Sequence, residues 1–148
     1  MSSGTPRSIR FEQRVSERLA SYVASHPGWS GSSAANRFID EALRMEDHPG
    51  VLFRDGPTGR RAVLIGGPDV REVIRTVRSA RGAEPELDAE EIVALVSTNT
   101  GVPRRLVEIA IRYWAAYPDE IDSWIADTDS FEEHQLQAWQ RRQELLAR

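Results

Sequence analysis

The sequence contains no cysteine and no lysine. Without cysteine, the chain has no disulfides, no thiolate metal sites and no cysteine nucleophile. The longest uncharged run, Ile92 to Pro103, is about 12 residues long, whereas a membrane-spanning helix needs roughly 20. The first residues also lack the apolar stretch of a signal peptide. We therefore expect a cytoplasmic protein that has no membrane partner.

Charge is distributed unevenly along the 148 residues, of which 40% are apolar and 28% charged. All 19 basic residues are arginine, which suits contacts with phosphate and guanine but also arises from codon bias. Residues 1–82 carry 13 Arg and 9 acidic residues, whereas residues 83–148 carry 6 Arg and 14 acidic residues. The basic first part is the part suited to nucleic acid.

Residues that would support catalysis are scattered. His26, His48 and His134 do not have the spacing of metal ligands. Adjacent carboxylates such as Glu90 and Glu91 point in different directions on a helix, and no Gly-x-Ser-x-Gly elbow occurs. We therefore expect no enzyme, no catalytic residue, no metal and no cofactor.

A short alternating segment begins at residue 7. Its pattern predicts a strand with Ile9 and Phe11 on one face and Ser8 and Arg10 on the other. A lone strand of this length leaves its backbone groups unpaired. We expect two copies to pair antiparallel in a homodimer, which makes a two-stranded ribbon that fits the major groove of double-stranded DNA.

Two helices are predicted after this strand, at about residues 13–25 and 33–45, from apolar residues at helical spacing. The turn from Ser30 to Ser33 supplies candidate N-caps for the second helix. A strand and two helices in about 40 residues are too small to bury a core alone. This is a second reason to expect a dimer.

The pattern as a whole resembles the ribbon-helix-helix (CopG/Arc-like) family of DNA-binding proteins, over about residues 7–46. The resemblance lies in Ser-Ile-Arg-Phe at 8–11, Val-Ser-Glu-Arg-Leu at 15–19 and the segment 32–44. It implies that Ser8 and Arg10 read bases and that Arg7 contacts the DNA backbone. It also implies a phosphate clamp at the N-terminus of the second helix, formed by Ser30, Gly31, Ser32 and Ser33. The alternative is that the arginines only keep an edge strand soluble.

A β-hairpin is predicted next, because apolar runs at 51–54 and 60–65 flank the Gly/Pro-rich turn 55–59. Arg54, Arg60 and Arg61 lie near its tip, where they either contact phosphate or pair with Asp55. The arginines Arg71, Arg75 and Arg78 are expected to form a basic stripe on the helix that follows.

Helical patterns fill the remaining chain. Asp88 and Glu91 are spaced as a capping box, and helix, helix, turn, helix over 69–117 is compatible with a helix-turn-helix. In that arrangement Arg104 and Arg105 lie at the N-terminus of the recognition helix. The alternative is a compact packing or partner-binding unit.

A second resemblance covers about residues 48–127 and concerns the domain-of-unknown-function 433 family. It is carried by His-Pro-Gly-Val at 48–51, the segments 53–62 and 66–70, and Ala-Ile-Arg-Tyr-Trp at 110–114 with 117–122. That family occurs in bacterial proteins often described as VapB-type antitoxins. The resemblance implies a toxin-antitoxin system whose partner is a PIN-domain ribonuclease toxin.

The end of the chain is expected to form a short helix at 121–125 and a final helix at about 130–147. The final helix either closes the core or inserts as an amphipathic helix into a partner's groove, in which case the acidic stretch 119–133 would cover a basic nuclease surface.

The sequence therefore predicts a mainly α protein with short β elements. Residues 1–47 are expected to form the dimerising, DNA-binding domain, and 48–148 a hairpin plus helical domain. The leading function is an antitoxin-like autorepressor. A stand-alone transcription factor or DNA-organising protein and a protein-interaction module are the alternatives.

Overall fold

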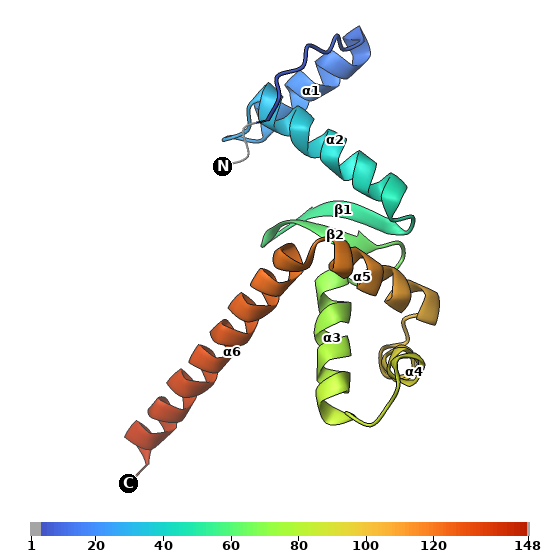
Figure 1. Ribbon diagram of the computed structural model, residues 1–148. Coiled ribbons are helices and arrows are strands. Elements are labelled where there is room, and N and C mark those ends of the chain that lie inside the picture. Colours follow the sequence, from blue (N-terminus) through green and yellow to red (C-terminus); the bar gives the residue numbers. More distant parts are fainter. Residues whose placement is uncertain (1–3, 148) are drawn as a thin grey trace. The chain divides into compact units, whose positions relative to one another are not determined.

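The computed structural model describes residues 4–147, which form two compact units with the division between Leu43 and Arg44. The mainly α class with short β elements is confirmed (Figure 1). The elements are α1 (Gln13–Ser25), α2 (Gly31–Asp47), β1 (Val51–Gly56), β2 (Gly59–Leu64), α3 (Val70–Ala83), α4 (Ala89–Thr100), α5 (Arg104–Ala116) and α6 (Pro118–Leu146).

The first unit is a pair of helices with little interior. No residue of α1 is buried, whereas Ala34 of α2 is fully buried. α1 ends at His26, and Gly28 supplies the positive φ of +93° that the turn into α2 requires. The second helix begins two residues earlier than predicted, because Ser30 rather than Ser33 precedes it as the capping residue.

The predicted strand over residues 7–11 is not formed in the single chain, where residues 4–12 have no regular secondary structure. A strand is defined by its hydrogen-bonded neighbour, and the single chain offers this segment none. The ribbon between two copies therefore stays a prediction.

The predicted hairpin is confirmed. β1 and β2 pair antiparallel, with Val51 opposite Leu64 and Asp55 opposite Arg60, around the two-residue loop 57–58. Strand residues Val51, Ala62 and Leu64 are buried against the helices of the second unit. The hairpin thus covers one side of a helical core.

The core of the second unit lies among the hairpin, α3, α4, α5 and the start of α6. Its largest fully buried side chain belongs to Tyr113. The other buried members are aliphatic residues: Val51, Ala62, Leu64, Val70, Val73, Ile74, Ile92, Val96, Val102, Leu106, Val107, Ala110, Ile121 and Ile125.

Local signals at the ends of α4 agree with the sequence. The Asp88 carboxylate accepts from the Glu91 amide at 2.9 Å, and the Glu91 carboxylate accepts from the Asp88 amide at 2.8 Å, which completes the predicted capping box. At the other end Gly101 takes the left-handed conformation, with φ of +74°. The chain then turns directly into α5.

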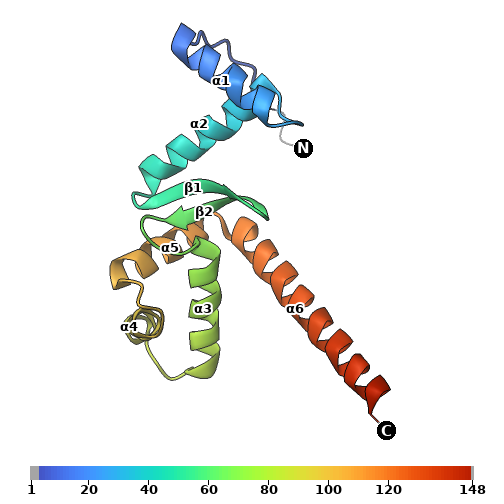
Figure 2. The same ribbon diagram turned by 180° about the vertical axis from the view of Figure 1, so that it is seen from behind.

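The predicted break near residues 126–129 is wrong, because α6 runs without interruption from Pro118 to Leu146. The sequence predicted separate helices over 121–125 and about 130–147. In the structure Asp129 and Glu132 of the continuous helix both bind Arg75 of α3. Figures 1 and 2 show the later part of α6 extending away from α3, α4 and α5.

Candidate nucleic-acid interface

The proposed base-reading residues lie in the segment before α1. Arg7, Ser8 and Arg10 are all exposed, and in the described part of the chain no carboxylate contacts either arginine. Ile9 and Phe11 are exposed by 58% and 38%, a large fraction for apolar side chains in one short segment. This segment therefore exposes both cationic and apolar side chains.

Phe11 also lines an apolar groove between α1 and α2. The groove has a volume of about 450 Å³ and belongs wholly to the first unit. Its lining is almost entirely apolar: Phe11, Val15, Leu19, Tyr22, Ala35, Phe38, Ile39 and Ala42, with Arg18 at the edge. The helix pair therefore leaves open the face on which a small domain would normally form its core.

The N-terminus of α2 is built by two serines. The Ser30 hydroxyl accepts from the Ser33 amide at 3.0 Å, and the Ser33 hydroxyl accepts from the Ser30 amide at 2.9 Å. In the part of the chain that the structure describes, the amides of Gly31 and Ser32 donate to no acceptor. Such exposed amides, with the positive end of the helix dipole, suit a phosphate.

The loop before this helix end is held by aromatic contacts. The His26 ring stacks on Tyr22 with the ring centroids 3.9 Å apart, and the His26 Nδ1 lies 2.8 Å from the Tyr22 carbonyl. The central carbon of the Arg37 guanidinium lies 4.5 Å from the centre of the Trp29 ring. Trp29 immediately precedes Ser30 in the chain. These contacts flank the serine cap in the chain, and they were not predicted from the sequence.

Arg104 and Arg105 lie in the first turn of α5, as predicted, and both are exposed. The helix begins after Pro103, which supplies no capping side chain. Among residues 4–147 no acidic group contacts either guanidinium. The three helices predicted over residues 69–117 are formed as α3, α4 and α5. Contact of these helices with DNA stays a prediction.

The arginines of the hairpin are paired within the protein. Arg60 lies 3.4 Å from Asp55 and Arg61 lies 2.7 Å from Asp69. Of the two alternatives for this cluster, pairing with Asp55 is observed for Arg60, whereas Arg61 pairs with Asp69, which was not predicted. Arg54 is exposed.

The predicted basic stripe on α3 is neutralised by neighbouring acidic residues. Arg71 lies 3.3 Å from Asp69, Arg78 binds Asp122 of α6, and Arg75 binds two further α6 carboxylates. The hydrogen bond between Arg75 and Glu132 raises the pKa of the Arg75 guanidinium and lowers the pKa of the Glu132 carboxyl. Part of the acidic stretch 119–133 is thus used inside the chain.

A polar cluster within the second unit was not predicted. The buried Tyr113 hydroxyl donates to Glu120 at 2.8 Å and accepts from Arg44 at 3.0 Å. Arg44 also contacts Glu120 at 3.1 Å and stacks over Tyr117 at 3.8 Å. Burial of Tyr113 is the main reason that the pKa of its hydroxyl group lies well above the ordinary value, and the nearby Glu120 charge is the second reason. The phenol therefore stays neutral.

Comparison with known proteins returned no matching family model, no matching curated protein and no matching solved structure. Both family resemblances therefore stay predictions. Over the residues that the structure describes, no helix combines the length and the apolar character needed to cross a membrane. Within the same residues, no three His, Asp or Glu side chains lie together as a metal site.

Proposed function

We propose that the protein is a homodimeric regulator that binds double-stranded DNA through its N-terminal unit, and that it acts as an antitoxin-like autorepressor. The observation that carries this proposal is the open apolar groove of α1 and α2, together with the exposed segment that leads into it. Two copies that bury these grooves against each other would gain the core that one copy lacks.

Pairing of the two N-terminal segments follows from the same arrangement. With Ile9 and Phe11 turned toward the helices, alternation along a strand directs Ser8 and Arg10 to the opposite face. A two-stranded ribbon fits the major groove, where Arg pairs with guanine and a hydroxyl serves as donor or acceptor. The open amides at the start of α2 would bind a backbone phosphate, which positions the ribbon.

The charge distribution favours the N-terminal unit, rather than the second unit, as the DNA-binding part. Residues 44–148 carry 14 Arg and 19 acidic residues, and most arginines of the hairpin and of α3 are paired with carboxylates. Arg104 and Arg105, in the first turn of α5, are exposed and serve as a second, weaker candidate contact.

The test is selection of duplexes from a random-sequence DNA library by the full chain, followed by titration of the selected duplex at fixed salt. Arg10→Ala is expected to cost about 1–3 kcal/mol on the selected duplex and much less on random DNA, because it removes a base contact. Arg14→Ala, in the first turn of α1, is the matched control and should weaken both duplexes by a similar small factor.

The proposal fails if the library yields no enriched sequence, or if Arg10→Ala binds the selected duplex as tightly as the wild type. Autorepression adds a further requirement, since the selected sequence must then occur upstream of the protein's own gene. A gene for a small ribonuclease beside it would support the antitoxin version over a stand-alone regulator.

A further inference from the structure

A hollow of about 890 Å³ lies in the second unit between α3, α4 and α5. The buried residues Ile74 and Ile92 belong both to the core and to the lining of this hollow. Half-buried apolar residues from all three helices, packed against the core, form the rest of its apolar wall: Val77, Val93, Ile111 and Trp114. We call this hollow the three-helix pocket.

The size of the three-helix pocket suits a small molecule. Its volume falls within the range of small-molecule sites, roughly 300–1,000 Å³. Along α3 and α5 the lining extends over about two helical turns, at residues 74–82 and 108–115, and α4 closes a third side with residues 89–93. A pocket that is bounded on three sides and is this short matches a compact ligand with an apolar body.

Three exposed guanidinium groups lie at the rim of this pocket. Arg78 and Arg81 come from α3 and Arg112 comes from α5. Arg78 binds Asp122 of α6, so the charges of this pair cancel. Arg81 donates to the Leu87 carbonyl at 2.6 Å, which orients its guanidinium group without neutralising it.

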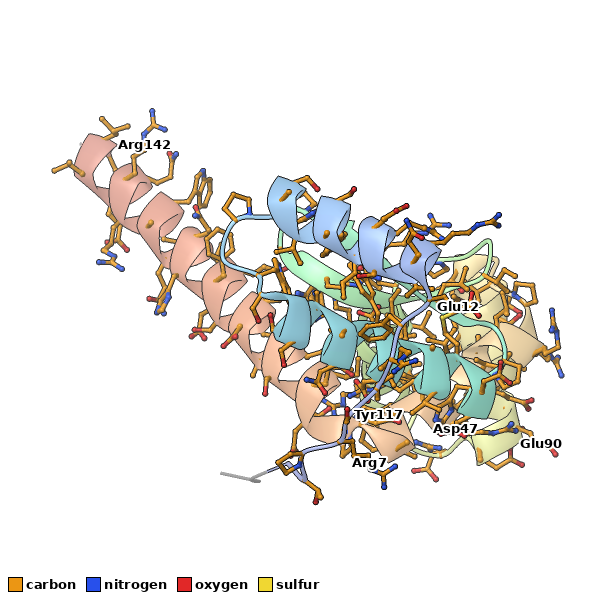
Figure 3. The ribbon with its side chains drawn as sticks, turned by 90° about the horizontal axis from the view of Figure 1, so that it is seen from above. Arg7, Glu12, Asp47, Glu90, Tyr117 and Arg142 are labelled. Carbon is orange, nitrogen blue, oxygen red and sulfur yellow. The ribbon has the colours of Figure 1, made fainter. Side chains whose placement is uncertain are left out.

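The remaining charge of the rim is positive. Among residues 4–147 neither Arg81 nor Arg112 contacts a carboxylate, and the lining described there contains one acidic residue, Glu108. Two guanidinium groups and one carboxylate leave one positive charge, although residues 44–148 as a whole carry 14 Arg and 19 acidic residues. Glu90 of α4 is exposed, lies at the outer edge of its unit in Figure 3 and does not line the pocket.

We propose that the three-helix pocket binds a small amphiphile that carries a single carboxylate. The acyl or aryl body of the ligand lies on the apolar wall, and Arg112 binds the carboxylate, because a guanidinium group offers paired N–H donors to such a group. Arg81 adds positive potential at the same rim. The pocket belongs wholly to the second unit, so this proposal does not depend on DNA binding or on dimerisation through the first unit.

The experiment measures binding of decanoate to the full chain by isothermal titration calorimetry. Decyltrimethylammonium, which has an alkyl chain of similar length and a positive head group, should bind at least about tenfold more weakly because of the charge of the rim. Arg112→Gln should weaken decanoate binding by about tenfold, the effect of losing one charge-assisted hydrogen bond. Arg105→Gln is the matched control, because it removes an equal charge from α5 outside the pocket, and it should leave the affinity unchanged.

Two further variants test the position of the ligand and the sign of the charge effect. Ala115→Trp places a large side chain in the pocket and should remove decanoate binding. Glu108→Gln removes the one carboxylate of the lining and should strengthen decanoate binding by about two- to threefold. A gain of affinity does not arise from misfolding, so this variant keeps the test decisive if another variant is unstable.

No saturable binding of decanoate, equal binding of decyltrimethylammonium, or unchanged affinity in Arg112→Gln would overturn the proposal. Full affinity in Ala115→Trp, or no gain in Glu108→Gln, would do the same. Arg18→Gln changes the cation at the edge of the groove between α1 and α2. Loss of decanoate binding in this variant rather than in Arg112→Gln would place the ligand in that groove and would also overturn the proposal.

Discussion

The Tyr113→Phe substitution tests the polar cluster of the second unit by removing one oxygen atom. The ring is fully buried and keeps its packing against His48, Phe53 and Tyr117 in the variant. What is lost is a hydrogen bond to the Glu120 carboxylate at 2.8 Å and another from the Arg44 guanidinium at 3.0 Å.

The magnitude follows from the partners that remain. Each hydrogen bond to a charged group contributes about 1.5–3 kcal/mol. Arg44 and Glu120 still contact each other at 3.1 Å, and the Glu120 side chain is 46% exposed, so water replaces part of the loss. We therefore expect Tyr113→Phe to lower the free energy of unfolding by about 2 kcal/mol, which is less than the sum of about 3 kcal/mol for two such bonds at the low end of their range.

The assay is urea unfolding followed by far-UV circular dichroism, in which the midpoint should fall while the slope stays constant. A double-mutant cycle with Glu120→Gln then gives the coupling energy between the two side chains. A loss below about 0.5 kcal/mol, or no coupling to Glu120, would refute the reasoning, since typical buried hydrogen bonds contribute more than this.

The same hydroxyl group makes stability depend on alkaline pH. Burial raises the pKa of Tyr113 in the folded protein above the value of about 10 in the unfolded chain. Its contribution is therefore complete below pH about 10 and is lost as pH rises toward the folded pKa. Tyr113→Phe should lose less stability than the wild type between pH 10 and 11.

Two further predictions concern the first unit. Because α1 buries no residue in one chain, the apparent free energy of unfolding of a dimer should rise by about 1.4 kcal/mol per tenfold increase in protein concentration, and the urea midpoint should rise with it; a midpoint independent of concentration would contradict dimerisation. Ser30→Ala and Asp88→Ala each remove a helix cap and should cost about 1 kcal/mol in thermal or urea unfolding. Only Ser30→Ala should also weaken binding of the selected duplex; equal DNA affinity for both variants would remove Ser30 from the phosphate clamp.

Local signals in the sequence were sufficient for the elements whose ends are set by neighbouring residues. The hairpin followed from a Gly/Pro turn between two apolar runs, and the start of α4 followed from Asp88 and Glu91. In these cases the contacts that decide the structure join residues at most a few positions apart. The first turn of α5 with Arg104 and Arg105 was predicted in the same way.

The prediction was wrong where a distant residue decides the outcome. Two separate helices were predicted over 121–125 and about 130–147, but Arg75, more than 50 positions earlier in the chain, binds Asp129 and Glu132 of one continuous helix. The basic stripe on α3 was visible in the sequence, whereas its neutralisation by α6 was not. Charge counts along a chain do not reveal which charges face each other.

The sequence alone determined the helical class, the hairpin and the capping box of α4, because these depend on periodicity and short-range hydrogen bonds. The tertiary structure decided which arginines are paired, that Tyr113 joins Arg44 to Glu120, and that α1, α2 and the end of α6 leave apolar faces uncovered. Burial and ion pairing depend on residues far apart in the chain, and only folding brings such residues together.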